Sequence, residues 1–202
     1  MKFPLFASFI IFIIWFTIQL ARRENKDNAI KQSFWEKERR ANNTRRQSLD
    51  NLPYIRISYE SLFLHLLPDN ERADEYREIF HSLSESQIVN FTGITNTDLK
   101  LKYGAPNIDL LTHYDQNFTL LARTLQQWAS LLYENGYTKE ARKILEMAVS
   151  IKTDVSGSYR LLCKIYREEN TPEKIKELYP AAESLNSLMK NTIVRILQES
   201  EP

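Results

Sequence analysis

An uncharged apolar run at the start of the chain constrains what the rest of the chain can be. It extends over eighteen residues from Phe3 to Leu20, and two arginines, Arg22 and Arg23, follow it. A helix of that length, rising about 1.5 Å per residue, reaches roughly 27 Å, close to the hydrocarbon thickness of a bilayer. The run is longer than a signal-peptide core, and no small-x-small cleavage motif follows it. The sequence therefore predicts a transmembrane signal-anchor helix over residues 1–21; a cleaved signal and a buried or interfacial apolar helix are the alternatives.

The charges beside the run predict its orientation. Lys2 alone precedes it, whereas nine basic and five acidic residues lie between Arg22 and Asp50, a net charge of +4. An excess of Lys and Arg marks the cytoplasmic side of a span. We therefore expect a single-pass protein of the cell membrane, with its N-terminus outside and its C-terminal domain in the cytoplasm. The lipid bilayer would then be a partner of Phe3–Leu20.

The remainder of the chain is mildly acidic and poor in glycine. Residues 51–202 hold 17 basic and 21 acidic side chains, a net charge of −4, which offers no basic footprint for nucleic acid. The single cysteine, Cys163, cannot form a disulfide within the chain. Only four glycines occur, Leu, Glu, Lys, Arg and Ala are abundant, and no stretch alternates as a strand does. The sequence therefore predicts an all-α fold, with one N-terminal transmembrane helix and a helical hairpin or solenoid domain.

Two segments separate the apolar run from the strongly helical C-terminal part. The first, residues 22–52, is predicted to be a basic juxtamembrane neck with a semi-independent helix from about residue 34 to 49. The second, residues 53–106, is less regular. We expect an irregular helical cap region there, in which Asp69 or Asn70 caps a helix.

A helical hairpin is the clearest pattern in the C-terminal part. From Asn107 to Leu132, apolar residues recur every three or four positions, and a second periodic run extends from Thr138 to Ile151. The turn residues Asn135 and Gly136 lie between the two runs. The pattern predicts two helices packed as a hairpin.

Small residues recur inside this hairpin, where they let two helix backbones approach closely. Ala129 lies seven residues before Gly136, Ala141 lies five after it, and Ala148 lies seven further on. On this spacing, residues 122–155 resemble a tetratricopeptide repeat, a helix–turn–helix unit of about 34 residues.

One repeat later, residues 156–189 resemble a second, degenerate unit. Pro180 lies where the second helix of that unit should continue, and it should kink or split the helix. The predicted tetratricopeptide-like domain covers residues 107–202. Its predicted repeat-packing residues are Trp128, Ala129, Gly136, Ala141, Leu145, Ala148, Cys163, Tyr166 and Ala182.

The resemblance implies a function, because such repeats generally form scaffolds that bind peptides or helices in a concave groove. We therefore expect a membrane-anchored scaffold or adaptor whose cytoplasmic repeat-like domain binds another protein. A structural subunit of a larger membrane complex is one alternative. An enzyme with a site near residues 90–115 is another, and a generic helical bundle is the alternative fold.

No residue pattern indicates catalysis. His65, His81 and His113 are scattered, without an HExxH motif or a pair one helical turn apart. Cys163 falls among apolar residues, as a buried inert thiol does. We expect no enzymatic activity, no catalytic or metal-binding residue and no cofactor. The candidate recognition surface, where aromatic and polar residues cluster, consists of Tyr103, Asn107, His113, Tyr114 and Asp115.

Overall fold

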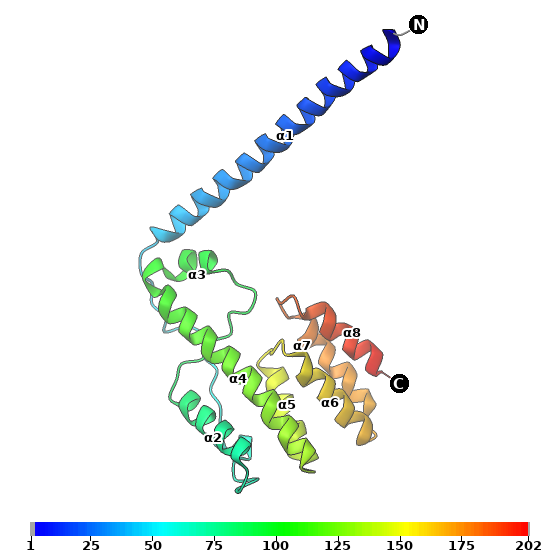
Figure 1. The fold of residues 1–202 in the computed structure, drawn as a ribbon. Coiled ribbons are helices and arrows are strands. Elements are labelled where there is room, and N and C mark those ends of the chain that lie inside the picture. Colours follow the sequence, from blue (N-terminus) through cyan, green and yellow to red (C-terminus); the bar gives the residue numbers. More distant parts are fainter. Residues whose placement is uncertain (1–2, 202) are drawn as a thin grey trace. The chain divides into compact units, whose positions relative to one another are not determined.

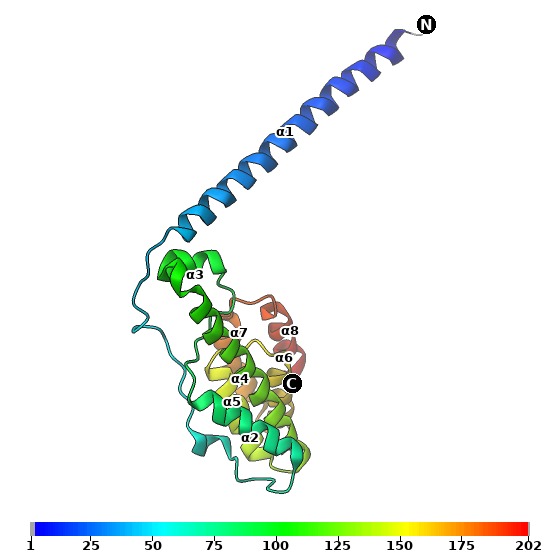
Figure 2. The same cartoon turned by 60° about the vertical axis from the view of Figure 1, so that its left-hand side comes forward.

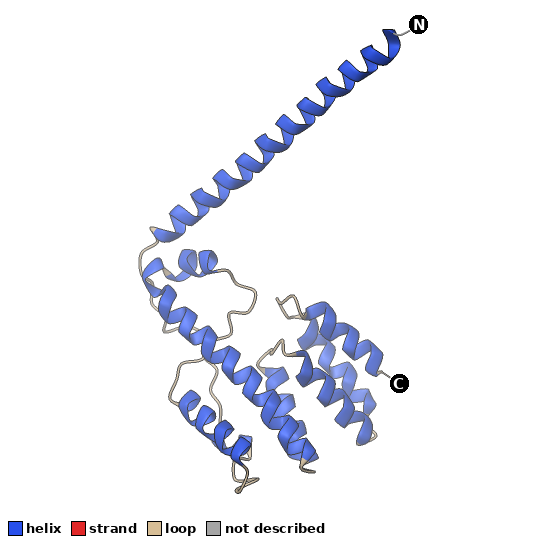
Figure 3. Ribbon diagram, in the orientation of Figure 1, coloured by secondary structure: helices blue, strands red, loops and turns tan. Residues whose placement is uncertain are grey.

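Residues that favour helices dominate the chain, and its secondary structure is helical. A computed structural model describes residues 3–201, with the side chains of 3–7, 25 and 29 left out of the description. Within these residues the regular elements are all helical and none is a strand, which confirms the all-α prediction (Figure 3). The chain divides into two units, one made of residues 1–47 and 96–106 and the other of residues 48–95 and 107–202.

The first unit is built on one long helix, α1 (Phe3–Asn42) (Figures 1 and 2). After Pro4, no proline or glycine interrupts it, so the predicted anchor helix and the start of the predicted neck helix are one continuous helix. That helix ends at Asn42, and the predicted continuation to about residue 49 is not helical. Its large apolar side chains between Phe9 and Leu20 are exposed. Its C-terminal end packs against α3 (Asn96–Tyr103).

Polar side chains join α1 to α3. The Lys100 ammonium donates to Glu38 Oε1 at 2.6 Å, and the Thr97 hydroxyl donates to Glu38 Oε2 at 2.6 Å. These two hydrogen bonds lower the pKa of Glu38. Beside them, Ala41 is completely buried.

The apolar start of α1 does not make a membrane span within the described residues. No described helix is both long enough and apolar enough to cross a bilayer. The predicted transmembrane helix and the single-pass cell-membrane localisation, with the C-terminal domain in the cytoplasm, are therefore wrong. Residues 1–2 of that prediction lie outside the described residues.

The second unit is a set of packed helices around one core. Asn70 caps the first of them, with its side-chain oxygen accepting the Ala73 amide at 3.1 Å. The long helix α4 packs against α2 on one side and against α5 on another, and α6 packs against both α5 and α8. The α-helices are α2 (Glu71–Ser84), α4 (Ile108–Glu134), α5 (Thr138–Ser150), α6 (Ser156–Glu168), α7 (Tyr179–Glu183) and α8 (Lys190–Ser200); the 3₁₀ helices are η1 (Tyr59–Leu62) and η3 (Pro172–Leu178). A further 3₁₀ helix, η2 (Ala105–Asn107), begins in the first unit and ends in the second.

The hairpin turn between α4 and α5 recurs after α6 with the same geometry. Gly136 has a φ of 84°, and Asn170, 34 positions later, has a φ of 56°. The Tyr137 amide donates to the Leu132 carbonyl at 2.9 Å, and 34 positions later the Thr171 amide donates to the Tyr166 carbonyl at 2.8 Å. Each turn thus ends its helix with a left-handed residue and the same backbone bond.

Buried positions follow the same 34-residue spacing. The residues of each pair are at most 1% exposed, so equivalent positions contribute to the core in both repeat-like segments, 122–155 and 156–189. Ile193 and Leu197 of α8 continue the series and are completely buried. The pairs are Leu125 with Tyr159, Trp128 with Leu162, Ala129 with Cys163, Ala141 with Ile175, and Ala148 with Ala182.

The second helix of the second repeat-like segment, residues 156–189, is broken. Residues 172–178 form the 3₁₀ helix η3, and α7 begins at Tyr179. Pro180 therefore lies in the first turn of α7, where its missing N–H has no intrahelical partner to lose. The chain stays in register with α5 despite this break, because Ala182 is still completely buried.

The turn predicts a graded response to substitution at Gly136. Gly136→Ala should lower the free energy of unfolding by about 1–2 kcal/mol, since a Cβ is unfavourable at positive φ. No atom lies within 4 Å of that Cβ, so the loss reflects backbone strain alone. Gly136→Asn should lose less, because Asn170 already occupies the equivalent position. Urea unfolding followed by circular dichroism measures both values, and equal losses would contradict the equivalence of the two turns.

Candidate protein-docking site

The five residues of the predicted recognition surface do not form one exposed cluster. Tyr103 belongs to the first unit and the other four to the second. Asn107 and Tyr114 are buried, whereas His113 is exposed. The Tyr114 ring packs edge-on against Tyr54, with 5.9 Å between the ring centroids. Asn107 and Tyr114 thus contribute to packing, and recognition by the five residues stays a prediction.

Asp115 is the member of that set with the most distinctive surroundings. Its Oδ1 accepts a hydrogen bond from the Phe91 amide at 3.0 Å. Burial raises the pKa of Asp115, and the nearby negative charge of Asp154 raises it further, whereas the bond from Phe91 acts in the opposite direction. Asp115 and Asp154 line an open cavity of about 470 Å³ together with Arg123.

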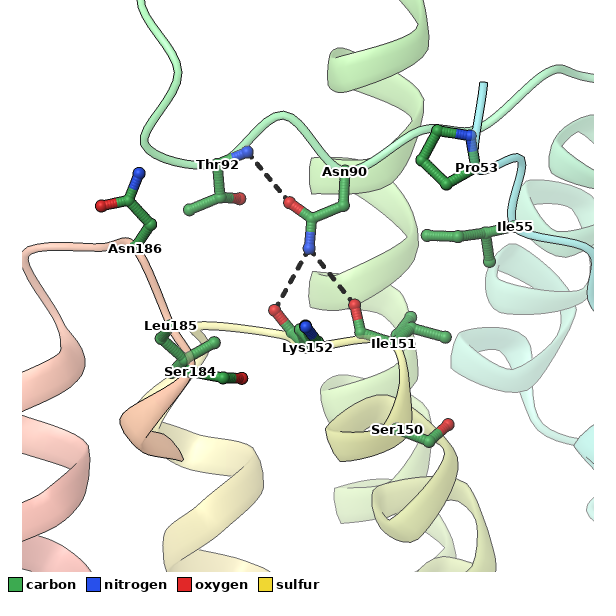
Figure 4. A pocket seen from close by; sticks show the side chains of 10 residues that line it. All are labelled: Pro53, Ile55, Asn90, Thr92, Ser150, Ile151, Lys152, Ser184, Leu185 and Asn186. Atoms are coloured by element: carbon green, nitrogen blue, oxygen red, sulfur yellow. Dashed lines mark hydrogen bonds between the residues drawn. The ribbon is translucent and has the colours of Figure 1, made fainter. Parts of the chain in front are cut away.

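The segment around residues 90–93 connects the ends of the two hairpins. The Asn90 side-chain amide donates to the carbonyls of Ile151 and Lys152 at 3.2 and 3.3 Å, just after α5 (Figure 4). The Asn186 side-chain amide, just after α7, donates to the Gly93 carbonyl at 3.0 Å. One strap, residues 90–93, thus fastens both repeat ends.

A second open cavity lies beneath this strap, with a volume of about 420 Å³. Two of its walls are equivalent triplets, Ser150–Lys152 and Ser184–Asn186, which lie 34 positions apart (Figure 4). Its charged group is Lys152, which is exposed. The other lining residues are Pro53, Ile55, Asn90 and Thr92.

The predicted repeat-packing residues lie where two helices must approach. Apart from Gly136 in the turn, they all belong to one buried core cluster. Trp128 is completely buried, and its indole N–H donates to the Leu62 carbonyl at 2.7 Å. Its ring also meets Tyr76 edge-on, with the centroids 6.2 Å apart. Trp128 therefore joins η1 and α2 to the first hairpin.

Neighbouring helices α4 and α6 carry a polar exposed face that was not among the residues predicted from the sequence. The Tyr133 hydroxyl of α4 donates to the Glu168 carboxylate of α6, at 2.7 and 2.8 Å from its two oxygens. The Lys164 ammonium lies 4.8 Å from the Tyr133 ring centroid and 3.9 Å from Glu168. Arg160, one turn before Lys164 on α6, and Arg167, just before Glu168, are also exposed. Placing the charged residues of 156–168 at about 3.6 residues per turn puts them on one side of a helix, a signal that could have located this face.

Groups that could perform chemistry are scattered over the described residues. No group of three or more His, Cys, Asp or Glu side chains there could hold a metal ion. Burial raises the pKa of the Cys163 thiol, which disfavours the reactive thiolate. The polar residues of 90–115 make structural hydrogen bonds, as Asn90 and Asp115 do.

Comparisons with known proteins do not assign the chain to a family. No family profile, no curated protein and no solved structure matches it.

The strap predicts that two chemically identical glycine substitutions differ in cost. Gly93 and Gly136 have nearly the same φ, 80° and 84°, but a Cβ on Gly93 would lie 1.7 Å from the Asn186 carbonyl oxygen. Gly93→Ala should therefore destabilise the fold by at least about 1 kcal/mol more than Gly136→Ala. It should also speed amide exchange in residues 90–93. Urea unfolding and hydrogen exchange measure these effects; an equal loss of stability would show that the strap is not fastened at Asn186.

Asp115 predicts a pH dependence of stability. Because its pKa is raised on folding, the folded state binds the proton more tightly, so ionisation of Asp115 lowers stability as the pH rises above its unfolded value of about 4. Asp115→Asn keeps an oxygen that can accept from Phe91 and removes the charge. The variant should match or exceed the natural protein in unfolding free energy at neutral pH. The difference should shrink as the pH falls through the raised pKa, and a variant that is less stable only at neutral pH would contradict this.

Proposed function

We propose that residues 107–202 form a tetratricopeptide-like helical array that acts as a scaffold and docks another protein. The observation that supports this most is the 34-residue recurrence of the hairpin turn, in which Gly136 and Asn170 are equivalent. This spacing matches the period of the tetratricopeptide repeat. The buried small residues Ala129, Ala141 and Ala148 support the same interpretation, since they allow close approach of paired helices.

The departures from the repeat pattern account for the weakness of the sequence signal. Leu132 replaces the usual aromatic residue of the first helix, and Thr153 replaces the terminal proline. Thr153 is nevertheless completely buried, and its carbonyl accepts the Tyr159 hydroxyl at 3.1 Å. Pro180 breaks the last helix. We infer that packing at equivalent positions has been kept although the residue types have changed.

Docking requires an exposed and rigid surface. The first helices of the two repeat-like segments, α4 and α6, provide one. The α4–α6 face offers Tyr133, Lys164 and Glu168, held to one another across two helices. Helix α8 starts 34 positions after α6 and extends the series. Because the face lies on packed helices and not on loops, a partner would meet preordered side chains, which limits the entropy cost of binding.

Site-specific photo-crosslinking tests the scaffold proposal on the full-length protein in the cells that make it. A photoreactive amino acid is placed at Gln127 or Arg195, which are exposed equivalent positions two repeats apart. The matched controls are Lys139 and Glu173, exposed equivalent positions on α5 and η3. We expect Gln127 and Arg195 to capture the same partner protein and the controls to capture it at least about tenfold less. Equal capture at all four positions, or none at any, would refute docking on this face.

A further inference from the structure

We propose that the exposed side of α6 that carries Arg160, Lys164 and Arg167, here called the basic stripe, binds an acidic segment of the docked protein. This inference rests on the scaffold function proposed above. The three residues are spaced four and three positions apart, so they lie along one side of the helix. All three are exposed.

The stripe opposes the charge of its surroundings. Residues 51–202 carry a net charge of −4, yet the exposed side of α6 presents three cations close together. Arginine stays charged at all physiological pH values. The neighbouring Tyr133 hydroxyl raises the pKa of Lys164, with a smaller contribution from Glu168, so this ammonium also stays charged.

The acidic groups near the stripe already have partners. Glu168 accepts the Tyr133 hydroxyl and lies 3.9 Å from Lys164. Glu169 pairs with Arg142 at 3.3 Å. Arg167 makes a long contact of 3.5 Å to the Glu201 carbonyl. Among the described residues, Arg160 and Arg167 form no ion pair with a carboxylate, so each can still pair with an acidic ligand, Arg167 through the donors that the Glu201 carbonyl does not use.

The spacing of the two arginines sets the geometry of the ligand. Seven positions along a helix separate Arg160 from Arg167, a distance of about 10.5 Å. An extended peptide covers that distance in roughly three residues, at about 3.4 Å each. Because alternate side chains of an extended segment share one face, carboxylates two to four positions apart, about 7–14 Å, bracket that distance, and each guanidinium group can bind a carboxylate in bidentate fashion.

Neutral polar groups border the stripe on α4. The Gln126 amide donates to the Ser130 hydroxyl at 3.0 Å, and a Cβ on Gly157 of α6 would lie 3.2 Å from that Gln126 amide. Helices α4 and α6 thus approach closely beside Arg160. An amide and a hydroxyl at this place suit the backbone of an extended peptide, while the stripe takes its carboxylates.

The test uses full-length protein and fluorescein-labelled decaglutamate, with labelled decaglutamine as the neutral probe. Fluorescence anisotropy measures binding at low and at physiological salt. We expect decaglutamate to bind with an affinity that falls as salt rises, and decaglutamine to bind at least about tenfold more weakly. No preference for decaglutamate would overturn the proposal.

Matched charge reversals assign the binding to the stripe. The double variant Arg160→Glu/Arg167→Glu should weaken decaglutamate binding at least about tenfold. The control Lys139→Glu/Lys176→Glu, which makes the same change in net charge at exposed positions of α5 and η3, should weaken it less than about threefold. Equal weakening would assign the binding to net charge and refute the stripe. Arg160→Gln/Arg167→Gln, with circular dichroism to verify folding, excludes damage by the introduced acids.

The photo-crosslinks at Gln127 and Arg195 separate this inference from the scaffold function. If Arg160→Glu/Arg167→Glu abolishes capture of the partner, the acidic-ligand inference is supported together with the scaffold. If capture persists undiminished in that variant, the scaffold function stands and the acidic-ligand inference falls. If the natural protein captures nothing, the scaffold function itself falls.

Discussion

The close packing of α4 against α5 is the interaction on which the second unit depends. Ala129, Ala141 and Ala148 leave no bulk between the two backbones, so the helices approach closely and the large side chains are placed beside the contact line. The left-handed residue Gly136 fixes the direction in which α5 returns. Since the same turn recurs at Asn170, the relation of α6 to the segment after it follows from the same geometry.

The first hairpin also organises the chain that precedes it. Trp128 donates from its buried indole to the Leu62 carbonyl, and Arg77 of α2 donates to the carbonyls of Leu64, Leu66 and Leu67 at 2.7–2.8 Å. A buried polar group without a partner costs about 1–3 kcal/mol, so these donors stabilise an irregular segment that has no ladder of its own. The core hairpin and its cap are therefore one cooperative structure.

Local periodicity predicted what local sequence determines. The helices of the hairpin, the turn at Gly136, the cap near Asn70 and the break near Pro180 each depend on residues close in the chain. The strap was not predictable, because Asn90 bonds to carbonyls 61 and 62 positions away and Asn186 bonds to Gly93 across 93 positions, and amides on the surface carry no periodic signal. The expectation of a membrane span in α1 was wrong, since no described helix is both long enough and apolar enough to cross a bilayer.

The two repeat-like segments differ in the exposed charge on α6 and in the break between η3 and α7. Equivalent core positions hold apolar residues in both segments, so the differences between the two segments lie in the turn, the broken helix and the exposed side. On the exposed side of α6, cations at Arg160, Lys164 and Arg167 add nothing to the core, and like charges at one-turn spacing on a helix are destabilising by a few tenths of a kcal/mol. Tyr133 and Glu168 offset that repulsion only around Lys164. The two arginines therefore retain their charge without a counterion from the described chain, and an acidic ligand would remove the repulsion that folding leaves in place.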